Sequence, residues 1–260
     1  MNSNFDYPQF IRMFSSNLDC LEYLHNQKWK SGYICRKCGS KTAKNSSASL
    51  SKRCTACGYD ESPTAHTFFH KLKIPIKKAF LMTYRIMMSK KGLSALSLSS
   101  EFNVNPNTAW AFKKKLQAAL EANLKEPVSS KISRIFRKLD GLNISFRGKG
   151  CNGFQQLYLI IGCTKEGEYR LIPGEMVIDL PSSEKLTPSE LFEGHYVSEG
   201  KDLMMWHLKS WITGTHHHCS RQHLSGYVAE FIFKYNARKN RKMLWEKLIN
   251  ALVSSYNSRR

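Results

Sequence analysis

Apolar residues at helical spacing dominate the first half of the chain. In residues 1–30 they recur every three or four positions, which predicts a helical lead-in. The residues at these positions are Phe10, Phe14, Leu18, Leu21 and Leu24. Over 75–88 apolar residues are so frequent that we expect a buried helix, which Lys90-Lys91-Gly92 would end.

Two further helices are predicted directly afterwards, over 94–102 and 106–124. Asn105 is a favourable N-cap for the second, and Pro106 stands at the first helical position, where its missing N–H removes no bond. A short turn joins the two helices. This pattern is typical of a helix-turn-helix, in which the second helix enters the major groove of DNA.

On the helix-turn-helix interpretation, the start of the second helix faces the bases. Asn107 and Thr108 would meet base edges, and three lysines one to two turns later would contact phosphates. These lysines are Lys113, Lys114 and Lys115. An ordinary helical hairpin with a solvated basic face explains the pattern equally well, so both interpretations stay open.

Residues 131–180 change from a helical to a strand-like pattern. We expect strands at 157–162 and 169–178, joined by a turn at Glu166-Gly167. After about Asp202 the pattern is helical to the end, with a break at 213–220. A linker is expected near 126–130. The chain is therefore predicted to form three units, over residues 1–64, 65–128 and 129–260.

Four of the eight cysteines form two CxxC pairs, Cys35 with Cys38 and Cys54 with Cys57, fifteen residues apart. This is the spacing of a four-cysteine zinc site, because zinc takes four thiolates in a tetrahedron and each pair holds one edge. A glycine follows each pair and can adopt the positive φ of a tight turn. We predict a structural Zn²⁺ that supplies the folding energy of this small ribbon.

The charge balance points to a polyanionic partner. The 260 residues carry 40 Lys and Arg against 20 Asp and Glu, a formal net charge of +20. Such an excess favours DNA or RNA as partner, although some ribosome- and membrane-associated proteins are also basic. There is no apolar run of the roughly 20 residues that a membrane span needs, and no signal-peptide pattern. We expect a cytoplasmic, nucleoid-associated protein with reduced cysteines.

Several motifs resemble those of bacterial insertion-sequence transposases. In the first half they lie at 53–59, 63–71, 90–95 and 107–110, and in the second half at 208–217, 222–224, 227 and 230–238. The resemblance covers nearly the whole chain except about 165–200. His66 departs from the family, which usually has glycine there.

The resemblance implies an α+β fold with an N-terminal zinc ribbon, a helix-turn-helix region and a C-terminal mixed α/β domain of the ribonuclease-H-like superfamily. The chain is short for this family, which suggests an internal truncation of that domain. The family's activity would be DDE-type cleavage and strand transfer with Mg²⁺ or Mn²⁺. Its partners would be double-stranded DNA, as inverted-repeat ends and target, and further copies of the chain assembled on DNA.

Strand cleavage and joining need carboxylates that hold two divalent metals about 3.5–4 Å apart. By resemblance, Asp140 matches the first family aspartate, although Gly141 stands where the family commonly has Glu. Asp202 precedes Lys209 by seven residues, about two helical turns, so they share a face. This pair matches the family's last acidic or polar position and a lysine that touches DNA. Asp179 is then the middle carboxylate.

A second register is nearly as good. Asp140 and Asp202 are 62 residues apart, which resembles the family's spacing from first to second aspartate. The segment that leads to the third ligand would then be missing.

Three functions stay open: an active transposase, an inactive descendant that only binds DNA, or an unrelated zinc-ribbon transcription factor. The motif block at 208–238 counts against the third, and the histidines at 216–218 receive no metal role, since the family has a similar loop without zinc.

Overall fold

The computed structural model describes the N-terminal half and the C-terminal helices most completely. The described residues are 6–46, 50–125, 133–138, 156–164, 167–171, 177–180, 197–198, 203–215, 221–238 and 241–254. For the strands at 133–138, 156–160, 177–180 and 197–198, the description concerns backbone pairing alone.

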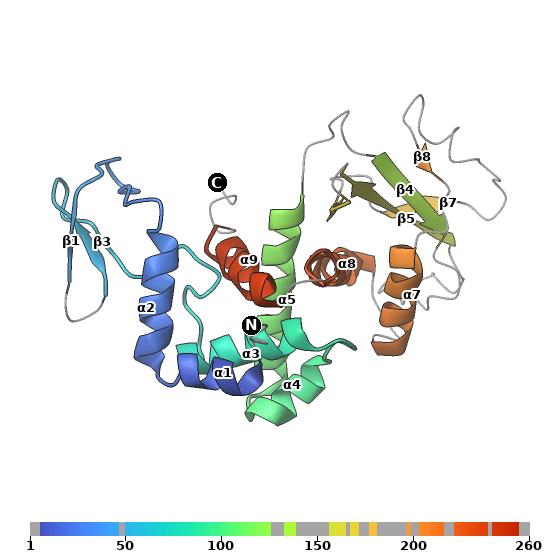
Figure 1. The fold of residues 1–260 in the computed structure, drawn as a ribbon, viewed down its shortest axis with the longest axis horizontal. Helices are drawn as coiled ribbons and strands as arrows, with labels where there is room; N and C mark the ends of the chain where they lie inside the picture. The colour runs from blue at the N-terminus through green and yellow to red at the C-terminus, as the bar shows by residue number, and fades with distance from the viewer. Residues whose placement is uncertain are drawn as a thin grey trace, which may run out of the picture.

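The described elements alternate between helices and small sheets (Figure 1). The helices are α1 (Tyr7–Met13), α2 (Asn17–Lys28), α3 (Ile76–Met88), α4 (Ala95–Phe102), α5 (Pro106–Leu124), α7 (Leu203–Thr215), α8 (Arg221–Asn236) and α9 (Arg241–Ser254). The three helices predicted between residues 75 and 124 are confirmed, with bounds shifted by at most one residue. Within the described part of the chain, no helix has both the length and the apolar character needed to cross a lipid bilayer.

The predicted lead-in consists of two helices instead of one. Ser16 begins α2 with a capping box: its hydroxyl accepts from the Asp19 amide at 3.1 Å, and the Asp19 carboxylate accepts from the Ser16 amide at 2.8 Å. This restart rotates the apolar pattern. Phe10 and Phe14 are buried as expected, whereas Leu18 is 56% exposed and does not enter the core.

The ribbon is a three-stranded antiparallel sheet in the order β1-β2-β3. Its strands are β1 (Ala43–Asn45), β2 (Lys52–Cys54) and β3 (Asp60–Glu61). Ala43 lies opposite Cys54, and Lys52 lies opposite Glu61. β2 thereby connects one metal-ligand turn to the strand that carries a buried carboxylate.

An aromatic cluster joins the two ends of the chain. Trp245 of α9 is 2% exposed, and its ring centroid lies 4.8 Å from Phe10, 5.8 Å from Phe14 and 5.7 Å from Phe80. The C-terminal helix therefore packs with α1 and α3. α5 runs between α9 and α8 and contacts both (Figure 1). The helices of both halves share one core.

The second sheet lies beside α7 and α8 (Figure 1). Its strands are β4 (Ser133–Lys138), β5 (Gln156–Cys163), β6 (Tyr169–Arg170), β7 (Val177–Leu180) and β8 (Val197–Ser198). β4 is antiparallel to β5 on one side and parallel to β8 on the other, while β6 and β7 both pair with β5. β5 confirms the strand predicted at 157–162. Mixed helices and small sheets give the expected α+β fold.

Candidate metal centre and nucleic-acid interface

The four paired cysteines converge in the ribbon. Their sulfur atoms all lie within 4.8 Å of one another. Cys35 Sγ lies 3.6 Å from Cys57 Sγ, and Cys38 Sγ lies 3.6 Å from Cys54 Sγ. These separations are too long for disulfides and close to the about 3.8 Å edge of a tetrahedron with metal–sulfur bonds of about 2.3 Å. The cluster can therefore hold one metal ion.

Both cysteine pairs use the same backbone turn. Gly39 donates to the Cys35 carbonyl at 2.8 Å, and Gly58 donates to the Cys54 carbonyl at 3.0 Å. The two glycines have φ values of 74° and 69°, as their positions in the sequence predicted. The amides of Cys35 and Cys54 donate in turn to Ser40 and Tyr59, each at 2.8 Å. Each pair of sulfurs is thus aimed by the residues of its own turn.

The turns also favour negatively charged sulfur. Burial acts to raise the pKa of Cys35, but the backbone amides of Cys38 and Lys37 and the Tyr33 hydroxyl outweigh it and lower that pKa to about 6. The amide of Cys57 lowers the pKa of Cys54. For Cys38 the Ser40 amide acts in the same direction, yet hydrogen bonds with neighbouring sulfurs prevail and raise its pKa to about 12. A cation at the centre would remove this opposition between thiolates.

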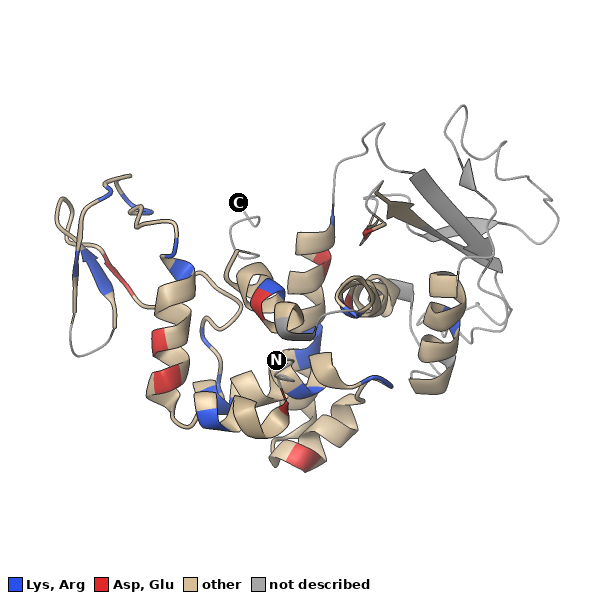
Figure 2. Cartoon of the chain, in the orientation of Figure 1, with Lys and Arg blue, Asp and Glu red and all other residues tan. Residues whose placement is uncertain are grey.

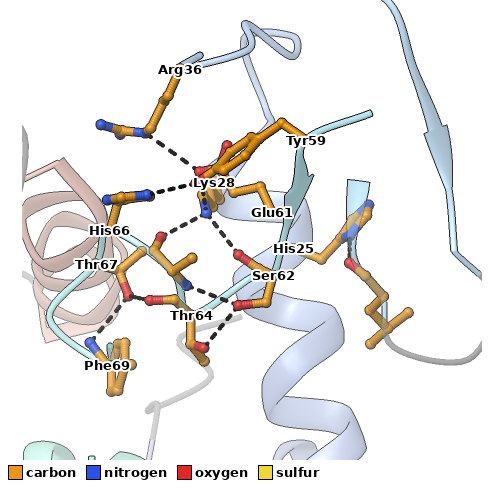
Figure 3. Close-up of polar contacts among 12 residues, drawn as sticks. His25, Lys28, Arg36, Tyr59, Glu61, Ser62, Thr64, His66, Thr67 and Phe69 are labelled. Carbon is orange, nitrogen blue, oxygen red and sulfur yellow. Dashed lines mark hydrogen bonds and ion pairs between the residues drawn. The ribbon is translucent and has the colours of Figure 1, made fainter. Parts of the chain in front are cut away.

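A buried ion pair attaches the ribbon to α2 (Figure 3). Lys28 Nζ lies 2.7 Å from Glu61 Oε1, and both side chains are under 10% exposed, at 6% and 2%. The same ammonium donates to the carbonyls of Ser62 and Ala65, at 2.8 and 2.7 Å. Arg36 adds a second cation to Glu61 at 3.4 Å. The ribbon's third strand is therefore held by a specific polar contact.

His66 follows this contact and stands where the family usually has glycine. Its φ is 55°, in the left-handed region that favours glycine. The His66 ring hydrogen-bonds to the Tyr59 hydroxyl at 3.0 Å and stacks on the His70 ring at 5.9 Å (Figure 3 draws the Tyr59 contact). These contacts offset the cost of a side chain at this backbone angle. Burial is the main cause that lowers the pKa of His66.

The turn between α4 and α5 has the predicted length, and Asn105 is the N-cap of α5 as predicted. Asn103 ends α4 with a φ of 46°, and the Asn105 side chain accepts from the Asn107 amide at 2.9 Å. Ser99 closes the turn from α4, donating its hydroxyl to the Val104 carbonyl at 2.6 Å. Asn107 is exposed and Thr108 is half-buried. The exposed residues of α5 lie mainly in its first two turns, with Asn123 exposed near its end, and α8 and α9 pack against the helix.

The three lysines of α5 differ in burial. Lys113 is 3% exposed, donates to the Leu93 carbonyl and lies 3.8 Å from Glu230 of α8. It faces the interior and is not positioned to contact a phosphate, because α8 packs over that side of α5. Lys114 and Lys115 are half-buried. Their ammonium groups lie 4.2 Å from the Tyr227 ring centroid and 2.8 Å from the His70 carbonyl, respectively. DNA contact by these two lysines stays a prediction.

Glu230 is the centre of a polar joint between α5 and α8. It is fully buried and accepts from Lys234 at 2.8 Å and from Gln117 at 2.9 Å. Burial acts to raise its pKa, but Lys234 and Lys113 outweigh burial and lower the pKa to about 2. The carboxylate thus neutralises two cations that the core would otherwise have to hold unpaired.

The turn at residues 90–92 packs against α7. Gly92 has a φ of 80°, and a Cβ at this position would lie 2.9 Å from Trp211 Nε1. Thr215 of α7 also donates its hydroxyl to the Lys91 carbonyl. The positive φ and the close approach of Trp211 both require a glycine here. In the sequence, Gly92 was predicted only as part of the end of the preceding helix. The helix that carries Lys209 is therefore in direct contact with the turn before α4.

Two of the four candidate catalytic residues lie outside the described residues. These two are Asp140 and Asp202, and the histidines at 216–218 also lie outside the described residues. Asp179 lies on β7, where its backbone pairs with Leu157 of β5. Lys209 lies on α7 and is half-buried. The described residues do not test whether the carboxylates converge, so their ligand roles stay predictions.

Residues 194–236 match the family model of the ISXO2-like transposase domain. The matched segment contains β8, α7 and α8. It therefore includes Lys209, Trp211 and Glu230. No curated protein and no solved structure matches the chain. The match confirms the resemblance to insertion-sequence transposases that the motifs at 208–238 indicated.

Proposed function

We propose that this chain binds the inverted-repeat ends of an insertion sequence and catalyses metal-dependent cleavage and strand transfer of DNA. The observation that carries the proposal is the match of residues 194–236 to a transposase domain. In the structure this segment packs through Glu230 on α5 and through Trp211 on the turn before α4, and α4 and α5 are the two helices that we assign to DNA binding. Recognition and chemistry would thus reside in one connected body.

The DNA-binding part would comprise the ribbon and the α4–α5 pair, acting as a helix-turn-helix. We assign Zn²⁺ to the four sulfurs, since an all-thiolate tetrahedral set in two CxxC turns suits that ion. Lys and Arg are spread over the ribbon and the helical body, as Figure 2 shows. Asn107 and Thr108 would contact base edges, with Lys114 and Lys115 on phosphates. A net charge of +20 supports a polyanionic partner.

The catalytic part would be a ribonuclease-H-like domain built on the second sheet. Parallel strands direct their carboxyl ends to the same edge of a sheet, and β4 and β8 are neighbours in parallel. Asp140 follows β4 in the sequence, and Asp202 follows β8 and directly precedes α7. Both registers use this pair as ligands of Mg²⁺ or Mn²⁺, which would activate the attacking oxygen and stabilise the leaving oxygen. Lys209 would contact the DNA backbone.

Asp179 separates the two registers. It lies on β7, which is divided from β4 by β5, about two strand spacings or ~10 Å in the sheet. This separation favours the second candidate function, an inactive descendant that binds DNA with an incomplete ligand set. If Asp179 is a ligand, Asp179→Asn should abolish cleavage of a duplex that carries the inverted repeats. If Asp179→Asn cleaves like the wild type, the first register is wrong.

The test of the proposed function is cleavage of those inverted-repeat duplexes by the full chain with Mg²⁺ or Mn²⁺. We expect nicks at the repeat ends, and none at a scrambled duplex of the same length. Binding without cleavage would favour the inactive descendant. Absence of both binding and cleavage would contradict the proposal.

A further inference from the structure

A large aromatic side chain is exposed in the middle of the first two turns of α5. Trp110 is 49% exposed, whereas its chain neighbour Ala109 is fully buried. Asn107 and Ala111 are exposed beside it. Residues three and four apart share one face of a helix. One face of α5 is therefore lined by Asn107, Trp110, Ala111 and Lys114. This face holds an apolar surface between an amide and an ammonium group.

Trp110 is held from the side and not covered. Its ring centroid lies 5.7 Å from the His223 ring of α8, in an edge contact. The ammonium of Lys114 lies 6.0 Å from the same ring. These neighbours restrict the indole while half of its surface stays in contact with water. Exposure of so much apolar area is unfavourable by itself, so a partner that covers the ring would recover free energy.

The chemistry of this face fits DNA better than a second copy of the chain. Residues 106–114 contain no acidic side chain, and the N-terminus of a helix favours anions. Glu101 of α4 is the nearest carboxylate in sequence, and Arg85 neutralises it through two contacts. In helix-turn-helix proteins the N-terminal residues of the second helix meet base edges. Trp110 occupies that part of α5.

We propose that Trp110 is a specificity-determining residue that packs on the C5-methyl group of a thymine in the major groove. This inference rests on the proposed function, because it requires that α5 enters DNA. Thymine is the base that offers an apolar group in that groove, and an exposed apolar side chain distinguishes it by contact. Asn107, one turn earlier, can hydrogen-bond an adenine with its amide. The recognised sequence should therefore contain an A·T-rich step under this helix.

The experiment uses the full chain and a pool of random-sequence duplexes. Wild-type protein is used to select its preferred duplex, and each thymine of that duplex is then replaced by deoxyuridine, which lacks the methyl group. One replacement should weaken wild-type binding about fivefold to tenfold. Trp110→Ala should bind the thymine duplex about tenfold more weakly and should not respond to that replacement. Its salt dependence should equal that of the wild type, because no phosphate contact is lost.

Two variants serve as controls. Trp110→Phe keeps an aromatic surface and should retain part of the thymine preference. Trp206→Ala removes a tryptophan of similar exposure, 57%, from α7 and should leave the preference unchanged. Trp110 lies at the surface, so its variants should keep the wild-type unfolding temperature.

Three outcomes would overturn the inference. In the first, Trp110→Ala selects the same sequence with wild-type affinity. In the second, deoxyuridine has no effect on the wild type at any position. In the third, Trp110→Ala changes the mass of the DNA-free protein in solution but not its sequence preference, which would assign the ring to a contact between subunits. If the wild type bound no duplex at all, the proposed function itself would fail with it.

Discussion

In the ribbon, the four sulfur ligands come from two turns with the same hydrogen bonds, and each turn is shaped by its own cysteine and glycine. In the region of the second sheet, by contrast, the candidate ligands Asp140 and Asp202 are 62 residues apart in the sequence. Their approach to one another, if they are ligands, would depend on the pairing of β4 with β8. The metal centre of the ribbon is therefore specified locally, whereas the proposed carboxylate site would depend on tertiary structure.

This difference teaches where each site is vulnerable. Damage to the ribbon turns should remove the metal and leave the helical core, which is built around Trp245 of α9. The packing of α8 on α5 depends instead on the polar joint where Glu230 meets Lys113 and Lys234. Variants of the two regions should therefore give separate effects.

The largest effect is expected at the metal centre. Cys54→Ser removes one of four thiolates, so the bound zinc should fall from about one per chain to none. Elemental analysis of purified protein checks this. Cys163→Ser is the matched control, because Cys163 is half-buried outside the cluster and should keep the metal. The local account requires that the helical core of Cys54→Ser still unfolds cooperatively; loss of all helical signal would contradict it.

The joint between α5 and α8 should give the next largest effect. Glu230→Gln leaves two cations without their carboxylate in the core, which should cost about 3–5 kcal/mol of unfolding free energy. Denaturant unfolding measures it. Lys247→Ala is the control, because it breaks a solvent-exposed pair with Glu168 (side chains 48% and 37% exposed). That pair should contribute less than about 1 kcal/mol.

The pH dependence of the unfolding free energy also tests the role of Glu230. The lowered pKa of Glu230, about 2 against an ordinary 4.5, means that its contribution is present above the ordinary value and is lost as the pH falls toward 2. Wild-type stability should therefore decline more steeply over this interval than that of Glu230→Gln. Parallel curves would show that the carboxylate is not charged in the folded protein.

A smaller effect is expected at the surface of α5. If Lys114 and Lys115 contact phosphates, the double alanine variant should flatten the plot of log affinity against log salt by about 1.8, or 0.9 for each contact. DNA binding by the full chain at several salt concentrations gives the slope. An unchanged slope would assign both lysines to their contacts within the protein, with Tyr227 and the His70 carbonyl.

The smallest effect is expected at His66. His66→Ala keeps the unfavourable φ and loses the bond to Tyr59, so it should destabilise the protein by about 1 kcal/mol. His66→Gly loses the same bond but removes the backbone cost, so it should be nearly neutral. Thermal unfolding of the two variants compares them. Equal destabilisation by both would mean that the backbone angle has little energetic weight.

The local features were the ones that the sequence predicted best. The cysteine spacing predicted the cluster, and Asn105 and Pro106 predicted the start of α5, because each signal lies within a few residues of the structure it sets. Even a local signal was missed at Ser16, whose capping box divides the expected lead-in. Periodicity alone did not reveal that cap.

Features that depend on tertiary contacts could not be predicted. In the sequence Lys113 cannot be distinguished from the lysines that follow it. It is a core residue because α8 packs against its side of α5. The same holds for Gly92, whose small size matters because Trp211 of α7 approaches it. The sequence also gave two registers for the carboxylates, since spacing along the chain does not determine which strands lie side by side.

The most direct measurement of the central claim is strand transfer of inverted-repeat ends into a target plasmid by the wild type and Asp140→Asn, with Mg²⁺ or Mn²⁺. Both registers make Asp140 a metal ligand. Strand transfer also needs the complete ligand set of the first register, so the proposed function predicts joined products with the wild type, and none with Asp140→Asn although it still binds the ends. In the second register neither protein would give a joined product. Equal amounts of joined product from the two proteins would exclude Asp140 from the mechanism and contradict the account.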